Sequence, residues 1–318
     1  MIGDLSFWMG KLAFPWFIIM VGWLKPYLLF PFHQILRGYL VDIYLVSFML
    51  SIFPTSLSRN LIIILKKNYF VLSLGCFFVF ILSCSAISAR ELPTYTIYQA
   101  QTPIIIDGHL DEPAWTAAPD VGSFSFPWWK SGKTEKTVSK LLWDKQNIYV
   151  SFIAEDSYMW GEKKVRDSAV FTDDCVEVFT APNPDDPQRY FNIEMNVIGT
   201  FLDQFHPKGP GVNNDPEWNG EGIKIATYFV GTLNNDSDID QYWILEVAIP
   251  LINFQQVAKN IPPKPGDIWR LNLNRLGGKT NAQYSQWSPS QTEKPQFHSP
   301  KDFGRVIFSD VKSPFWRS

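Results

Sequence analysis

Two short segments of the chain, 175–179 and 190–196, show strict alternation of apolar and polar side chains. In the first, Val176 and Val178 alternate with Glu177. In the second, three apolar residues alternate with four polar ones: Phe191, Ile193 and Met195 against Tyr190, Asn192, Glu194 and Asn196. Because successive side chains of a β-strand point to opposite faces, each segment predicts a strand with one apolar and one polar face. The apolar faces must be buried, and the polar faces must meet water or a ligand.

Further strand patterns follow along the chain, separated by turn signals such as Asp107-Gly108. We expect strands at 104–106, 138–143, 148–154, 223–230, 243–249, 268–275 and 303–308, and a long loop at 201–220. A short helical turn is expected after Asp111, with Trp115 entering the core. Helix signals are few. The sequence therefore predicts an all-β domain over residues 102–310, a two-sheet antiparallel β-sandwich of the immunoglobulin or jelly-roll kind.

The first 89 residues differ from the rest. Residues 1–64 are apolar in broken runs, most of them shorter than the roughly 20 residues that a membrane span needs. Residues 65–89 contain two lysines, an apolar run and a tail of small residues, which is typical of a secretory signal peptide. Signal peptides begin a chain, so we interpret residues 1–64 as upstream sequence translated by mistake. The alternative is a membrane anchor of several short spans. Residues 90–101 are expected to form a linker.

The predicted signal peptide could be processed in two ways. Cleavage after Ala89 would release a secreted or periplasmic protein. The sequence around Cys84 resembles a bacterial lipobox, in which this cysteine would carry a lipid. Either route predicts an extracytoplasmic domain, connected to a membrane only through the signal peptide, the lipid or the apolar N-terminus.

Charge and cysteine content narrow the classes of partner. Six of the 28 Lys and Arg residues but only two of the 31 acidic residues precede Arg90, so the remainder carries a net charge of −7. An acidic domain without a basic cluster argues against a nucleic-acid partner. Cys175 is the one cysteine after the signal peptide, so no disulfide framework is expected, and we interpret it as a packed core residue.

Several stretches together resemble the family 9 carbohydrate-binding modules. They are IDGHLDEPAW, LLWDKQNIYVSF, DDCVEVF, YFNIEMN, WILEVAIP, KPGDIWRLNLNR, WSP and HSPKDFGRVIF, in the order and spacing of that family. The resemblance covers roughly residues 100–310. It implies a β-sandwich related to DOMON-type domains and binding of a glycan without catalysis. It also implies structural calcium, for which it assigns no ligands in this sequence.

The resemblance carries individual roles to positions of this chain. The aromatic pair that stacks on sugar corresponds to Phe171 and Phe297, where the family has tryptophans. The sugar-contacting carboxylate corresponds to Glu177, and an Arg and an Asn correspond to Asn192 and Glu194. The candidate carbohydrate-binding residues are therefore Phe171, Glu177, Asn192, Glu194, Asn196, Trp287, Phe297 and His298.

Three alternatives remain open at the level of the sequence. Glu246 and the polar residues of 270–274 can equally be solvated side chains of an outer sheet face. Glu177 and Glu194 could be the two carboxyls of a glycoside hydrolase. A haem-binding electron carrier would need axial ligands such as Met195 and His298. His109 and His206 are expected to be ordinary surface residues of turns.

Overall fold

The computed structural model describes residues 90–212 and 214–316, and most of them lie in or between β-strands. One short α-helix, α4 (Pro113–Ala117), and the 3-10 turns η1 (Val170–Thr172), η2 (Leu251–Phe254) and η3 (Pro300–Asp302) complete the described secondary structure. The strands are β1 (Thr94–Gln99), β2 (Thr137–Trp143), β3 (Asn147–Glu155), β4 (Cys175–Ala181), β5 (Tyr190–Asn196), β6 (Phe201–His206), β7 (Lys224–Val230), β8 (Tyr242–Pro250), β9 (Ile268–Leu276), β10 (Tyr284–Gln286) and β11 (Gly304–Ser309).

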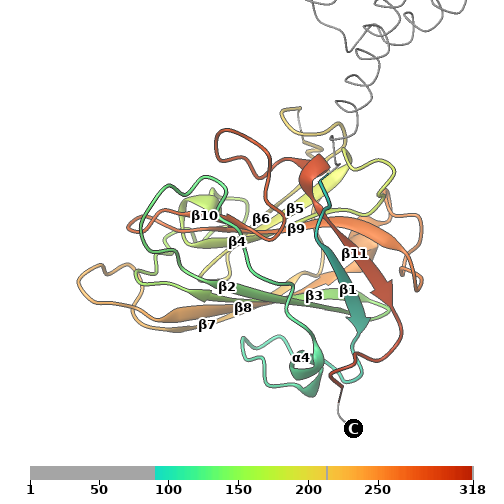
Figure 1. Cartoon of the computed structure of the whole chain (residues 1–318), viewed down its shortest axis with the longest axis horizontal. Helices are drawn as coiled ribbons and strands as arrows, with labels where there is room; N and C mark the ends of the chain where they lie inside the picture. The colour runs from blue at the N-terminus through green and yellow to red at the C-terminus, as the bar shows by residue number, and fades with distance from the viewer. Residues whose placement is uncertain (1–89, 213, 317–318) are drawn as a thin grey trace, which may run out of the picture. The chain divides into compact units, whose positions relative to one another are not determined.

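The strands form two layers (Figure 1). The upper layer in that view contains β6, β5, β4, β9 and β10, and the lower layer contains β2, β3, β8 and β7. The hydrogen-bonded order is β6-β5-β4-β9-β11-β1-β2-β3-β8-β7, with β10 also paired to β9. The predicted all-β sandwich is thus confirmed. The hydrogen-bonded strands form one curled sheet, however, and β1 pairs parallel with both β11 and β2. The expectation of two separate, wholly antiparallel sheets is corrected in this respect.

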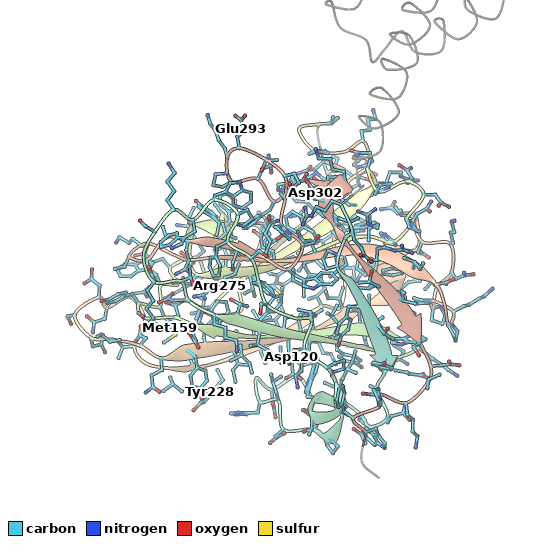
Figure 2. The ribbon with its side chains drawn as sticks, in the orientation of Figure 1. Asp120, Met159, Tyr228, Arg275, Glu293 and Asp302 are labelled. Atoms are coloured by element: carbon cyan, nitrogen blue, oxygen red, sulfur yellow. The ribbon has the colours of Figure 1, made fainter. Side chains whose placement is uncertain are left out.

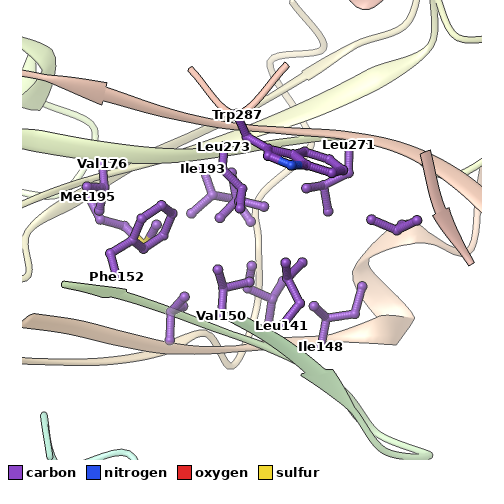
Figure 3. Packing of buried hydrophobic residues seen from close by; sticks show 14 of the residues in the cluster. Leu141, Ile148, Val150, Phe152, Val176, Ile193, Met195, Leu271, Leu273 and Trp287 are labelled. Carbon is purple, nitrogen blue, oxygen red and sulfur yellow. The ribbon is translucent and has the colours of Figure 1, made fainter. Parts of the chain in front are cut away.

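The hydrophobic core lies between the two layers (Figure 3). The apolar faces expected from alternation point into it: Val176 of β4, Ile193 of β5 and Leu273 of β9 from above, and Leu141 and Val150 from below. Full burial of a side chain of this size stabilises the fold by about 1.5–3 kcal/mol. Residues Arg90–Ser318 form one compact unit, which contains this core. We therefore expect this segment to fold on its own.

Three segments differ from the sequence prediction. Residues 90–101 are not a linker, because β1 lies within them and buries Tyr95 and Ile97. Residues 201–220 are not wholly a loop, because β6 pairs with β5. Residues 104–106 form no strand, and the backbone amide of Ile105 donates instead to the side chain of Glu112 (2.9 Å).

The helical turn lies where the sequence predicts it, and Trp115 is buried. Its N-cap is Glu112 rather than Asp111. The predicted extension at 1–64 and the predicted signal peptide at 65–89, with Cys84, lie outside the described residues. Among the described residues, no helix has the length and apolar character that crossing a membrane requires.

Candidate functional site

The outer face of the upper layer carries polar side chains from five neighbouring strands. Strand register decides this, because directly paired residues share a face. Glu177 of β4 is paired with Glu194 of β5 and with Asn274 of β9, and Gln286 of β10 is paired with Asn274. We call the following set the polar face: Glu177, Tyr190, Asn192, Glu194, His206, Asn272, Asn274 and Gln286.

The polar face is buried, although it lies outside the core between the layers. Asn192, Asn272 and Gln286 have no exposed surface. The chain between β10 and β11 covers them, and Figure 2 places Glu293 and Asp302 of this segment above the upper layer. The outer face of the upper layer is therefore not simply exposed to solvent at these residues.

Side chains of β9 hold the covering segment in place. Arg270 donates to the backbone carbonyls of Phe303 (2.8 Å) and Lys301 (2.9 Å). Asn272 makes two 2.9 Å hydrogen bonds with the backbone of Ser288. Arg270 and Asn272 thus hold the covering segment, and the alternative that the polar residues of 270–274 are solvated does not hold for Asn272 and Asn274, which are fully buried.

Two carboxyl groups lie side by side on the polar face. Glu177 accepts a hydrogen bond from Asn274 (3.2 Å), and Glu194 accepts one from Asn192 (2.9 Å). Burial raises the pKa of Glu194 to about 7. Burial, and then the neighbouring Glu194, raise the pKa of Glu177 well above its usual value. Because neither carboxyl has a positive partner among the described residues, the pair holds protons at a pH where exposed carboxyls are ionised.

A chain of hydrogen bonds continues from the carboxyl pair to a histidine. Asn192 donates to Glu194 and accepts from Nε2 of His206 (2.6 Å). Both ends of this chain carry a buried polar atom without a hydrogen-bond partner in the described structure, Oε2 of Glu194 and Nδ1 of His206. Buried polar atoms are normally satisfied, so these two are open to partners that the described residues do not supply.

Two histidines and a tyrosine pack together beside this chain. The rings of Tyr190 and His206 stack with centroids 4.3 Å apart, and a 2.8 Å hydrogen bond joins the Tyr190 hydroxyl to Nδ1 of His298. Burial lowers the pKa of both histidines to about 4, so both imidazoles are neutral at neutral pH. His206 lies buried in β6, and its interpretation as a surface residue of a turn is wrong.

Aromatic rings border the polar face. Phe297 packs against Trp128 and Tyr284, with centroids 5.8 Å and 6.0 Å away. Phe297 is 8% exposed, whereas the ring of Tyr284 is 38% exposed. Tyr284, rather than Phe297, thus offers the accessible aromatic surface in this cluster.

Phe171 lies in η1, which packs against another part of the polar face. Its neighbour Val170 is buried with Cys175 and Leu202, whose side chains are on that face. Phe171 itself is 46% exposed. Both predicted phenylalanines therefore belong to segments that pack on the polar-face side of the upper layer. Phe171 is accessible there, and Phe297 is nearly buried.

Two predicted site residues, Asn196 and Trp287, make contacts that support the fold. Asn196 donates to the carboxylate of Asp173 (2.8 Å) and accepts from the amide of Thr200 (2.8 Å), so its side chain is occupied. Trp287 points into the core (Figure 3). A Cβ atom at Gly304 would lie 2.5 Å from the Trp287 ring. The Trp287 ring and Gly304 therefore fit together inside the core, away from the polar face.

Sequence reasoning missed several members of the site. Tyr284 and Gln286 alternate on β10 with a buried Ser285, a pattern too short to be read as a strand. Trp128 adjoins Trp129 in a segment without regular structure, and its position depends on distant contacts such as its hydrogen bond to the carbonyl of Thr292 (2.9 Å). His206 was hidden by the mixed polarity of residues 201–206.

Glu246 has a structural role on the outer face of the lower layer. Its carboxylate accepts hydrogen bonds from the indole of Trp115 (2.8 Å) and the amides of Asp107 (3.1 Å) and Gly108 (3.2 Å). It therefore anchors the α4 segment to β8. The alternative that Glu246 stands on a solvated outer face therefore does not hold.

The geometry argues against the two other functional classes. Met195 lies in the core and His298 lies over the opposite face of β5, so they cannot ligate one haem iron. Glu177 and Glu194 project from neighbouring strands into the same surface. A glycoside hydrolase instead needs its two carboxyls to flank the scissile bond.

The resemblance implies structural calcium, and the acidic, histidine and cysteine side chains of the described residues bear on that expectation. In the described ranges, no group of three or more acidic, histidine or cysteine side chains is arranged to hold a metal ion. The buried acids Glu135 and Asp156 instead form ion pairs with Arg275, at 3.4 Å and 3.1 Å.

Comparisons with known proteins agree with this fold. The profile of carbohydrate-binding family 9 matches residues 125–308. A candidate carbohydrate-binding protein from Bacteroides uniformis superimposes with a TM-score of 0.56 at 19% identity, over 68% of this chain and 99% of that one. A family 9 module from Caldicellulosiruptor kristjanssonii has a TM-score of 0.47 at 16% identity in its complexes with cellotriose and with glucose. These cover 68% of this chain and 95% and 97% of the module, respectively. No curated protein matches the chain.

Proposed function

Because the chain belongs to carbohydrate-binding family 9, we propose that its sandwich binds carbohydrate, without catalysis, on the polar face of the upper layer. The family consists of non-catalytic binding modules. One observation carries the choice of surface: two paired strands bring Glu177, Glu194 and Asn192 into a single cluster beside exposed aromatic rings.

The chemistry of the cluster suits a sugar. Carboxyl and amide groups donate to and accept from hydroxyls, which do both. The exposed rings of Tyr284 and Phe171 supply flat apolar surface for a pyranose face. Glu177, Asn192 and Glu194 form the polar part of this site, and His298 positions Tyr190 beside it. Phe297 supports Tyr284 from behind rather than contacting the sugar with an open face.

The cellular setting of this activity is extracytoplasmic. The support is the signal-peptide pattern at 65–89, with release after Ala89 or lipidation at Cys84. A module outside the cytoplasm meets polysaccharides and their fragments directly. Carbohydrate is therefore the partner we propose.

A glycan array on the segment 90–318, followed by calorimetry on each hit, tests the proposal. Tyr284→Ala and Phe171→Ala are each expected to weaken binding about three- to tenfold, the value of one aromatic contact. Tyr228→Ala is the matched control, because Tyr228 is a 40% exposed tyrosine on β7 of the lower layer (Figure 2). Equal losses in all three variants, or no hit on the array, would contradict the proposal.

A further inference from the structure

We propose that the polar face selects glycans that carry a free, protonated amine, and that the ammonium group binds between Glu177 and Glu194. This inference rests on the proposed function and specifies its ligand class. The ligand would be an unacetylated amino sugar. Four features of the site support it.

The first feature is a pair of carboxyls without a counter-charge. Glu177 and Glu194 are directly paired across β4 and β5 and are 2% and 4% exposed. Across residues 90–212 and 214–316, their hydrogen-bond partners are the neutral amides of Asn274 and Asn192. Because two buried like charges are unfavourable without a cation, the free pair holds protons. A bound ammonium would supply that cation and let the pair ionise.

The second feature is an excess of acceptors. Oε2 of Glu194, the buried atom of the carboxyl pair without a partner, accepts once the carboxyl has lost its proton. A sugar hydroxyl brings one donor and two acceptor lone pairs, whereas an ammonium brings three donors and no acceptor. The ammonium group therefore complements this surface better.

The third feature is that none of the described groups facing the pair can neutralise it. The titratable side chains facing it from β4, β5, β6 and the covering segment are Cys175, Tyr190, His206 and His298. Burial raises the pKa of Cys175 and Tyr190 and lowers the pKa of the two histidines, so all four are uncharged at neutral pH. Strands β9 and β10 contribute amides: Asn272, Asn274 and Gln286.

The fourth feature is size. Glu177 and Glu194 are 2% and 4% exposed, so a ligand would have to reach them through a small group and keep its sugar ring outside, beside the exposed ring of Tyr284. An acetamide in place of the amine adds bulk and removes the charge. The site should therefore reject the N-acetylated form of the same sugar.

Three oligosaccharides with one backbone test the inference, because they differ only at carbon 2. They are the β-1,4-linked trimers of glucosamine, N-acetylglucosamine and glucose, measured by calorimetry on the segment 90–318. The glucosamine trimer is expected to bind about tenfold more tightly than either other trimer, since a charge-assisted hydrogen bond exceeds a neutral one by roughly that factor. Its binding should also release a proton, measured as a dependence of the heat on the buffer. Its affinity should rise above pH 5 as the carboxyls ionise, as long as the amine of the ligand stays protonated.

Substitutions of the two carboxyls test whether they cause the preference for the amine. Glu194→Gln, or Glu177→Gln if the first does not fold, should reduce the preference for the amine to about twofold or less. Glu293→Gln removes an exposed charge from the covering segment and should leave the preference unchanged. If the array yields glycans but the three trimers bind equally, or Glu194→Gln leaves their ratio intact, this inference fails and the proposed function stands. If no glycan binds at all, both fail.

Discussion

Replacing Glu194 by Gln should make the protein more stable at alkaline pH, not less. The wild-type carboxyl has its pKa raised to about 7 by burial, against 4.5 for an ordinary glutamate. Between these two values the unfolded chain loses its proton while the folded protein keeps it. Stability therefore falls as pH rises from about 4.5 to about 7, and stays at the lower level above that. Glutamine cannot ionise and is free of this penalty.

The magnitude follows from the pKa shift. Each pKa unit corresponds to about 1.4 kcal/mol, so a shift of this size costs the wild type about 3 kcal/mol at pH 8 and almost nothing at pH 4. Removing a neighbouring negative charge from Glu177 adds to the gain. This is a large share of the 5–15 kcal/mol that typically separates folded and unfolded states.

Urea unfolding at pH 4, 6 and 8, followed by tryptophan fluorescence, measures the difference directly. The gain of Glu194→Gln over the wild type should grow with pH, while Glu293→Gln, an exposed control, should follow the wild type throughout. A variant whose stability differs from the wild type by the same amount at all three pH values would refute the reasoning, because the carboxyl would then not be holding a proton in the folded state.

Two further substitutions test the structural residues around the site. Arg275→Ala should destabilise the segment 90–318 by about 3–5 kcal/mol in urea unfolding, because it leaves the buried acids Glu135 and Asp156 without their partner; a loss under 1 kcal/mol would mean that water reaches these acids. Trp287→Ala should cost about 3–5 kcal/mol through the cavity it leaves, while the folded fraction keeps its relative affinities for different glycans. If the fully folded variant showed a changed glycan preference, Trp287 would have to belong to the binding site after all.

Alternation predicted the strands well wherever one face is wholly apolar. The pattern of β4, β5, β8 and β9 is clear because each alternates between core residues and polar ones, as Leu245 and Val247 do with Glu246. β6 was missed because Asp203 stands among its apolar residues, where it pairs with Arg166 at 2.8 Å. β1 was missed because its parallel pairing with β11 joins parts of the chain about 210 residues apart, which no local pattern reports.

The site was predicted in part for the same reason. Register on β4 and β5 follows from the sequence once the strands are known, so the meeting of Glu177 and Glu194 could be foreseen. The covering segment above these two residues could not be predicted. It depends on contacts such as the one from Trp128 to the carbonyl of Thr292, which come from irregular segments far apart in the chain. Burial of Phe297 and exposure of Tyr284 are consequences of that cover.

Glu246 and Glu194 illustrate why residue type alone does not identify a binding carboxylate. Both are buried glutamates on outer strand faces, and burial raises the pKa of both, to about 6 and about 7. Glu246 receives donors on both oxygens, from Trp115 and from the backbone of Asp107 and Gly108. Glu194 receives one donor, and its other oxygen receives none. Since buried polar atoms without partners are costly, the first carboxylate is complete as a structural anchor, whereas the second keeps one oxygen without a partner, where the proposed ligand would bind.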